Sequence, residues 1–395
     1  MSEYPFRAQK CSPRIGVDFH VFDGIFQGSR SHILGLFSAA IEIAPHLEFV
    51  FFLEKTSALK KISPVFSRPN VQLISMRRSP GPARLALQLP YLRYRHRIDL
   101  LHMQYRIPPI SLGPCAVTIH DMLFESHPHF FPKNFAKQSK YTFRFAARHA
   151  RLLFTVSEYS KAEICRRYNV LPQEMHVLHN AVDRSHYHPG TNGAEEIKTL
   201  GLDSNDYILT VGRLEPRKNH ANILRAYALL PQDAPPLVIV GQKDFGWEDT
   251  IDMAGSLGIS DKVRFCHDID DKVLPSLMRH ALFFVYPSYA EGFGMPVLEA
   301  MASGTAVITS DNTSLSEVAG GCALYVDPDS PDDIHAKMEQ LLDDLGLRDS
   351  LQTGGLVQAE KFSWQDSAAK LVSVYDNYFS TAAAQPHDAL SLEPK

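Results

Sequence analysis

The chain has 395 residues, more than the roughly 250 to 300 at which single hydrophobic cores stop growing, so we expect two domains. Its 45% hydrophobic and 21% charged residues are typical of a soluble globular protein, and no run approaches the ~18 apolar residues of a transmembrane helix. The N-terminal MSEYPFRAQK lacks the apolar run of a secretory signal, and the five cysteines form no C-x-x-C pair. The composition therefore argues against a membrane span, a disulfide framework and a structural zinc, and predicts a cytoplasmic protein.

The net charge of −4 conceals a strong asymmetry between the two halves of the chain. Residues 1–190 contain 25 Lys and Arg against 13 Asp and Glu, whereas the remainder contains 15 against 31. The basic first half indicates an anionic partner, either a phospholipid surface or a phosphate-bearing acceptor. The alternative is a chance distribution of charge over solvated faces.

Short β-rich runs alternate with helical patterns along both halves of the chain, which is the rhythm of a parallel sheet with crossover helices. A segment rich in Gly, Pro, Asn and charge, residues 184–206, interrupts this rhythm and is expected to link the domains. The strand candidates before it are 14–22, 47–54, 115–121 and 151–157. The five candidates after it are 206–214, 235–241, 262–266, 281–288 and 305–311.

Two further segments are defined by their composition. The last clear helix is predicted at 364–379, and the polar residues 381–395 are expected to form a disordered tail. Residues 77–97 interleave Arg with Leu and Tyr, which is compatible with a segment lying on a membrane surface or with a simple exposed helix.

The most informative stretch runs from Pro287 to Asp311. Glu291 and Glu299 cannot share one helix, because glycines and Pro296 intervene, so Glu291 is expected on a loop. Pro296 at the first helical position places Glu299 about one turn inside the helix. The free backbone N–H groups at that helix start form an anion site suited to a diphosphate, and the two carboxylates are suited to accept hydrogen bonds from sugar and ribose hydroxyls.

A second motif, VGRLEPRKNH, places Arg213 and Lys218 after a predicted strand. The carboxyl ends of parallel strands bind ligands in open α/β sheets, and fixed cations there stabilise negative charge that develops on a departing phosphate. Between the first strand and first helix, residues 23–32 place Gly24 and Gly28 on a loop and Ser29 as a helix cap, although the sequence lacks G-x-G-x-x-G.

These motifs resemble those of the retaining nucleotide-sugar glycosyltransferases of family 4. The E-x7-E pattern of Glu291 and Glu299 and the G-R-x4-K pattern ending at Lys218 carry the resemblance, together with VTIHDMLF, TVSEYSKAEI and the final helix after FSW. The resemblance implies an α/β fold of two Rossmann-like domains facing a central cleft (GT-B), with the C-terminal helix crossing back to the first domain. The implied units are 1–188 for the acceptor domain, 189–363 for the nucleotide-sugar domain and 364–380 for the returning helix.

The family pattern also implies roles for individual residues. Arg213 and Lys218 would hold the donor diphosphate, Glu299 would bind ribose, and Glu291 would contact hydroxyls of the transferred sugar. His120 would line the reaction centre and Asp121 would orient it or the acceptor. Backbone groups of the segment Gly292, Phe293, Gly294 and Met295 would bind the donor, and Gly28 and Arg30 would approach it from the first domain.

The resemblance favours transfer of mannose or a deoxyhexose from a GDP-sugar, without a divalent metal, onto a glycan or polyprenyl-diphosphate acceptor at the inner face of the membrane. The D-x-D strings Asp268/Asp270 and Asp327/Asp329 are interpreted as helix or turn caps. UDP- or dTDP-sugars remain alternatives. So do a glycosidase using both glutamates, an epimerase and a silent sugar-nucleotide binder, whereas a nucleic-acid module lacks any motif that reads bases.

Overall fold

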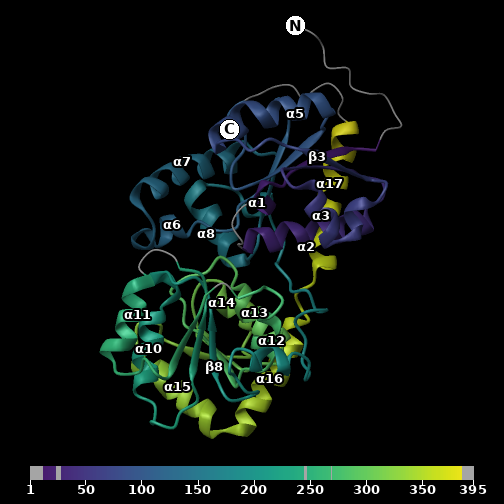
Figure 1. Ribbon diagram of the computed structural model, residues 1–395. Coiled ribbons are helices and arrows are strands. Elements are labelled where there is room, and N and C mark those ends of the chain that lie inside the picture. Colours follow the sequence, from purple (N-terminus) through teal and green to yellow (C-terminus); the bar gives the residue numbers. More distant parts are fainter. Residues whose placement is uncertain (1–11, 24–27, 244–246, 268, 385–395) are drawn as a thin grey trace.

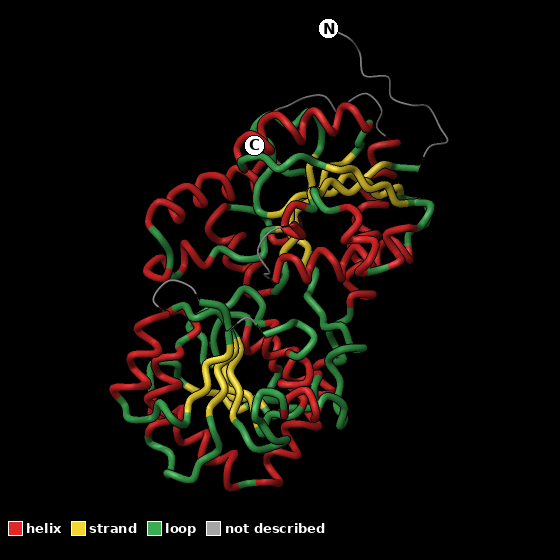
Figure 2. The backbone as a smooth tube through the Cα atoms, viewed as in Figure 1, coloured by secondary structure: helices red, strands yellow, loops and turns green. Residues whose placement is uncertain are grey.

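The computed structural model describes residues 12–23, 28–243, 247–267 and 269–384, which form two α/β domains (Figure 1). Figure 2 shows a sheet in each domain with helices around it and loops where the domains meet. The first sheet has seven strands and the second has six, and all the strand pairs are parallel. Buried parallel strands read as continuous apolar runs because both faces are covered, as in the fully buried LVIV and FFVY strands.

The first sheet has the strand order β3-β2-β1-β4-β5-β6-β7. Its strands are β1 (Arg14–Asp18), β2 (Glu48–Leu53), β3 (Val71–Ser75), β4 (Leu100–Gln104), β5 (Cys115–Thr118), β6 (Leu152–Thr155) and β7 (Met175–Val177). The accompanying helices are α1 (His20–Asp23), α2 (Gly28–Ile43), α3 (Thr56–Ile62), η1 (Pro64–Ser67), α4 (Gly81–Ala83), the π-helical η2 (Arg84–Gln88), α5 (Leu89–His96), α6 (Leu123–Ser126), η3 (Pro128–Phe130), α7 (Lys133–His149), α8 (Glu158–Tyr168) and η4 (Pro172–Glu174).

The second sheet has the order β10-β9-β8-β11-β12-β13. Its strands are β8 (Ile208–Val211), β9 (Leu237–Val240), β10 (Val263–Cys266), β11 (Phe283–Tyr286), β12 (Val307–Ser310) and β13 (Leu324–Val326). The helices are α9 (Ala194–Lys198), η5 (Pro216–Lys218), α10 (His220–Ala228), α11 (Trp247–Ser256), α12 (Leu274–Arg279), α13 (Met295–Ala302), α14 (Leu315–Ala319), α15 (Pro331–Asp343), α16 (Leu345–Ala359) and α17 (Trp364–Ala384). The prediction of five strands missed β13, which is a three-residue edge strand and too short to show a pattern.

Helices of different parts of the chain cover opposite faces of the first sheet. α2 and α17 pack on the face that carries Phe49 and Phe51. α5, α7 and α8 pack on the face that carries Val50 and Phe52. Consecutive strand residues point to opposite faces, so one run of phenylalanines supplies both cores.

The C-terminal helix α17 returns to the first domain, as predicted (Figure 1). Tyr375 is fully buried in the first-domain core, and Trp364 lies against α2 where Gly35 leaves room, since a Cβ there would meet the indole at 2.2 Å. The helix continues to Ala384, so the prediction of a disordered tail from residue 381 was wrong for its first residues. The Thr381 hydroxyl donates to the Asn377 carbonyl oxygen one turn earlier in this helix, and residues 385–395 lie outside the described residues.

The segment between the domains contains a short helix that its composition did not predict. α9 (Ala194–Lys198) is followed by β8, and the predicted boundary at residues 188 and 189 falls between the last strand of the first sheet and the first strand of the second. Asp270, interpreted from the sequence as a helix or turn cap, closes a turn by accepting the backbone N–H of Lys272, and α12 begins at Leu274. No helix of the described residues is long and apolar enough to cross a membrane.

Candidate active site

The loop between β11 and α13 carries the first glutamate, as predicted. Gly294 occupies the N-cap position of α13 with a φ of 102°, a conformation that favours glycine, and Met295 is the first helical residue. Pro296 is therefore the second helical residue and not the first. The N-terminus of α13, which carries the positive end of the helix dipole, begins four residues after Glu291.

Glu291 is the centre of a buried charged cluster. Its Oε1 atom accepts hydrogen bonds from Lys218 Nζ at 2.6 Å, Tyr286 Oη at 2.9 Å and Ser288 Oγ at 2.7 Å. Its Oε2 atom lies 2.9 Å from an Arg217 guanidinium nitrogen. One carboxylate oxygen is thus occupied by three donors, and Oε2 retains the capacity to accept another hydrogen bond.

The charges in this cluster balance one another. Burial alone would raise the pKa of Glu291, but Arg217 and Lys218 hold it at about 2. Burial opposes the charge of Arg217 too, yet Glu291 and Glu215 raise its pKa above the ordinary value. The pKa of Lys218 is lowered by burial and by the neighbouring Arg217. Lys218 is consequently the cation whose charge is held least firmly.

Arg213, the other cation of the predicted pair, follows the end of β8. Arg213 comes directly after Gly212, and Lys218 lies beside Gly212 as well, since a Cβ on that glycine would meet the Lys218 side chain at 3.4 Å. The backbone therefore brings the two cations to the same edge of the sheet. Lys218 ends η5, where Asn219 adopts a left-handed conformation with a φ of 63° and turns the chain into α10.

Glu299 lies in α13, one turn after its start, as predicted. Burial raises the pKa of Glu299 to about 7, and the negative charge of Asp271 adds to this rise. A hydrogen bond with Tyr187 acts in the opposite direction. Tyr187 belongs to the segment that links the domains, so this segment supplies a partner to the predicted ribose-binding carboxylate. Glu299 is in the partly protonated state at neutral pH.

The first domain supplies neutral groups to its side of the site. His120 follows β5 and is 6% exposed, and its Nε2 atom is hydrogen-bonded to Gln104 Oε1 at the end of β4. The imidazole of His32, from α2, packs edge-on against His120 with ring centroids 4.7 Å apart. Burial lowers the pKa of His120 well below its usual value and that of His32 to about 4, so both rings are uncharged.

Direct contacts hold the loop that carries Glu291 and Gly292 against the first domain. Ser157 Oγ, at the N-cap of α8, donates to the Gly292 carbonyl oxygen at 2.7 Å. A Cβ on Gly292 would meet Asp121 at 2.7 Å, which places Asp121 beside the glutamate loop. Glu317 of α14 accepts the backbone N–H of Glu158 at 3.0 Å and so caps the same helix. The structure therefore brings Asp121 to the predicted donor site.

The remaining predicted residues lie at the edges of this site or outside the described part. Gly28 is the first residue of α2, so Ser29 lies inside the helix and is not its cap. Gly24 lies outside the described residues. Arg30 stacks over Phe22 with its guanidinium carbon 5.0 Å from the ring centroid, and its charge acts on Asp271 of the second domain. Arg30 thus lies where the two domains approach each other.

The D-x-D strings take part in local turns. Asp327 Oδ1 accepts the backbone N–H of Asp329 at 2.9 Å, and the N–H of Asp327 in turn donates to Asp333. Asp268 lies outside the described residues, and Asp270 closes the turn before α12.

Family models match both halves of the chain. The model described as Glycosyltransferase Family 4 matches residues 45–186, and the one described as Glycosyl transferases group 1 matches residues 194–356. O-antigen chain mannosyltransferase B of Escherichia coli is 34% identical over 275 residues, which are 68% of this chain and 71% of that protein. The chain belongs to glycosyltransferase family 4.

More distant comparisons agree with this assignment. This glycosyltransferase is 30% identical to O-antigen chain mannosyltransferase RfbU of Salmonella typhimurium over 215 residues, 54% of this chain and 56% of that protein. Its structure matches that of Anabaena Alr3699/HepE in complex with UDP and glucose with a TM-score of 0.73 at 18% identity, covering 92% of this chain and 100% of that one. The latter likeness shows the GT-B fold.

Several residues at the site were not predicted from the sequence. Arg217, Tyr286 and Ser288 complete the shell around Glu291, and Gln104 and His32 flank His120. The adjacent Arg-Lys pair at 217 and 218 was a visible signal for Arg217. Tyr286 and Ser288 lie within five residues of Glu291 but form no recognisable motif with it, whereas only the folding of separate strands and helices brings Gln104 and His32 to His120.

Proposed function

We propose that this glycosyltransferase moves mannose, or a related deoxyhexose, from a GDP-sugar onto a lipid-linked or polysaccharide acceptor during synthesis of a cell-surface glycan. The proposal is supported by the names of two relatives, which are O-antigen chain mannosyltransferases. It also includes retention of the anomeric configuration and a cytoplasmic location at the inner face of the membrane. UDP- and dTDP-sugars are the alternative donors.

The cluster of Lys218, Arg217 and Glu291 at the start of α13 carries the proposal. Lys218 is paired with Glu291 in the structure. A bound diphosphate brings negative charge to the α13 N-terminus, so Lys218 and Arg213 turn to its oxygens, with no divalent metal required. Arg217 remains paired with Glu291 and keeps that carboxylate charged. The carboxylate oxygen of Glu291 that Lys218 has left then accepts hydrogen bonds from hydroxyl groups of the sugar.

Cleavage of the bond between the sugar and the phosphate builds negative charge on the leaving diphosphate. Fixed donors aimed at such charge contribute about 3 to 4 kcal/mol each to transition-state stabilisation. The acceptor hydroxyl attacks the face from which the diphosphate leaves and gives its proton to the leaving phosphate oxygen, so no protein nucleophile is needed. Glu291 is ill suited to a glycosidase nucleophile, because four donors surround it.

The proposal is tested by thermal unfolding with GDP-, UDP-, dTDP- and ADP-linked sugars. A ligand that binds only the folded state adds about 2.7 kcal/mol at a hundred times its Kd. We expect GDP-mannose to raise the Tm of the wild type and not that of Arg213→Ala with Lys218→Ala. The matched control, Lys198→Ala with Lys262→Ala, changes two lysines elsewhere in the second domain and should respond like the wild type.

The outcomes separate the parts of the proposal. Stabilisation by a different nucleotide series would replace the donor and leave the site in place. No response to any nucleotide sugar would contradict the donor site. An epimerase would convert the donor with no acceptor present, and a silent binder would leave it unchanged with every acceptor. NMR of the product's anomeric carbon tests retention.

A further inference from the structure

The positive charge of the first domain is concentrated in two stretches of sequence. Residues 55–98 contain ten Lys and Arg and no Asp or Glu, and residues 126–157 contain six Lys and Arg and no Asp or Glu. The first stretch includes α5 and the second includes α7. Such a separation of charge along the chain creates a one-signed surface only if the two stretches fold onto the same face.

The fold does bring them to the same face. α5 contributes Leu89 and Leu92 to the core that α7 enters with Phe143 and Ala146, so both helices cover one side of the first sheet. Figure 1 shows them along the outer edge of the first domain. The loop between β4 and β5 is fixed to α5, because Arg93 donates to the Pro114 carbonyl oxygen at 2.8 Å. The outer sides of α5, this loop and α7 are named here the α5–α7 face.

The α5–α7 face combines cations with exposed apolar side chains. On α7, Lys137, Arg144 and Arg148 are exposed along one side together with Tyr141, which is 65% exposed, and the helix contains no acidic residue. Large apolar side chains are exposed on η2, α5 and the adjoining loop. They are Leu87 (71%), Tyr91 (62%), Tyr94 (66%), Ile110 (72%) and Leu112 (46%).

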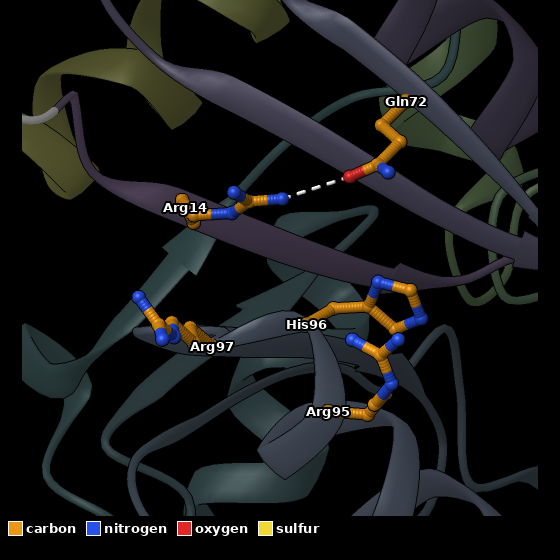
Figure 3. A pocket seen from close by; sticks show the side chains of 5 residues that line it. All are labelled: Arg14, Gln72, Arg95, His96 and Arg97. Atoms are coloured by element: carbon orange, nitrogen blue, oxygen red, sulfur yellow. Dashed lines mark hydrogen bonds between the residues drawn. The ribbon is translucent and has the colours of Figure 1, made fainter.

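A basic pocket lies at the end of α5. It has a volume of about 330 Å³ and is lined by Arg14, Gln72, Arg95, His96 and Arg97 (Figure 3). Arg14 reaches across to Gln72 Oε1 at 2.8 Å, and its buried Nε atom has no hydrogen-bond partner among the described residues. Two acids adjoin Arg14 and neutralise the positive charge of the pocket in part, because Glu48 lies 3.4 Å from its guanidinium group and Asp99 accepts its backbone N–H at 2.8 Å. In the described part of the chain, Arg95 and Arg97 form no ion pair, so the pocket keeps an excess of positive charge.

The neighbouring histidine reports this excess. The pKa of His96 is lowered by burial and by the charges of Arg95 and Arg14. A phosphate bound among these arginines would reverse that effect and raise the pKa of His96. Arginine binds phosphate with paired hydrogen bonds, so the lining suits a phosphate group better than an uncharged ligand.

We propose that the α5–α7 face docks on an anionic lipid bilayer, with the pocket at the end of α5 receiving the phosphate group of a lipid. Exposed tyrosines and leucine enter the interface between headgroups and acyl chains, while the cations of α7 contact the anionic headgroups. Nucleic acid would match the charge but not the exposed apolar side chains. The anionic bilayer repels the acidic second domain, and this repulsion turns the first domain toward the bilayer.

This inference rests on the proposed function in one respect, because a lipid-linked acceptor is encountered at a membrane. η3 immediately precedes α7, and its Phe130 stacks on Tyr289 of the second domain with centroids 5.4 Å apart. The docking face therefore begins where the two domains meet, so an acceptor held at the bilayer surface has a short path to the site.

The test is co-sedimentation of the full chain with vesicles of phosphatidylcholine alone and of equimolar phosphatidylcholine and phosphatidylglycerol. Each cation near an anionic surface contributes about fivefold to the partition coefficient. We expect the wild type to bind the anionic vesicles only. Lys137→Glu with Arg144→Glu should weaken binding by at least about 25-fold. Leu87→Ser with Tyr91→Ser should weaken it as well, whereas the control Lys198→Glu with Lys361→Glu on the second domain should not.

A second measurement addresses the pocket and does not depend on the charge-reversed variants. We expect short-chain phosphatidylglycerol below its micelle concentration to raise the pKa of His96, followed by NMR, and Arg95→Gln to remove this response. Equal binding to both kinds of vesicle, or unchanged binding of the α7 variant, would overturn the proposal. So would a response of His96 to inorganic phosphate alone, or binding of a short RNA without binding of vesicles.

Failure of the docking proposal and failure of the proposed function are separable. Vesicle binding is measured without any nucleotide sugar, and transfer to a soluble oligosaccharide acceptor is measured without vesicles. The α7 variant should retain the transfer activity of the wild type on the soluble acceptor, since neither Lys137 nor Arg144 belongs to the site.

Discussion

The two domains contribute different kinds of polar group to the site. On the second-domain side, Glu291, Lys218 and Arg217 are charged and in contact. On the first-domain side, His120 and His32 are buried and neutral, with their pKa values lowered by burial. The same physical condition, removal from water, therefore gives ion pairs where opposite charges meet and uncharged rings where they do not.

This difference assigns different work to the two sides of a transferase site. In the proposed reaction, cations of the second domain would balance the charge that develops on the leaving diphosphate. A neutral imidazole beside the transferred sugar would add hydrogen bonds without repelling the positive charge of an oxocarbenium-like transition state. Substitutions that change the kind of group on each side test this difference.

The largest effect is expected on the charged side. Arg217→Ala leaves Glu291 without a permanent cation once Lys218 turns to the diphosphate, so we expect kcat to fall about a hundredfold, with Arg217→Lys retaining part of the activity. The pKa of Glu291 should rise from about 2 toward its ordinary value. Steady-state kinetics against pH would show this as an acidic limb that moves to higher pH.

The control for that experiment is Arg225→Ala, which removes an exposed arginine of α10 that donates a hydrogen bond to Asn222 Oδ1 on the same helix. Arg225→Ala should leave kcat unchanged. A drop in thermal stability of Arg217→Ala without any change in kcat or in the pH profile would assign Arg217 a purely structural role.

A smaller effect is expected on the neutral side. The amide oxygen of Gln104 accepts a hydrogen bond, so the proton of His120 resides on Nε2 and its Nδ1 is left as an acceptor. Gln104→Leu frees the ring to change tautomer and orientation, and we expect kcat to fall about tenfold while the KM for the donor changes little. The ¹⁵N chemical shifts of His120 would report the tautomer in both proteins. Wild-type tautomer populations in Gln104→Leu would contradict this role.

The smallest effect concerns pH. Burial raises the pKa of Glu299 to about 7, and in the proposed ribose-binding role its charged form is the better hydrogen-bond acceptor for hydroxyl groups. Protonation below pH 7 therefore competes with binding, so we expect donor affinity to rise with pH up to about 7 and then to level off, with at most a tenfold change per pH unit. Calorimetric titration with GDP-mannose, whose phosphates do not titrate in this range, measures it. Glu299→Gln should bind more weakly and without this pH dependence.

The sequence determined the parts of this protein that depend on local chemistry. Alternating apolar runs and helical patterns predicted two α/β units, and the motifs around Arg213, Lys218, Glu291 and Glu299 identified the family, because each motif is completed within a few residues. The glycine and proline spacing placed Glu291 on a loop and Glu299 inside α13 with an error of one residue at the helix start.

Only the tertiary structure decided what those residues contact. Glu291 was expected to contact hydroxyls of the sugar, whereas the fold surrounds it with Arg217 and Lys218 of η5 and with Tyr286 and Ser288 from the strand and loop that precede it. Gln104 and His32 reach His120 from another strand and another helix. Such contacts join residues far apart in sequence, and burial fixes their charge states. No local sequence pattern predicts these contacts or charge states, because they depend on the order of the strands in the sheet and on the faces that the helices cover.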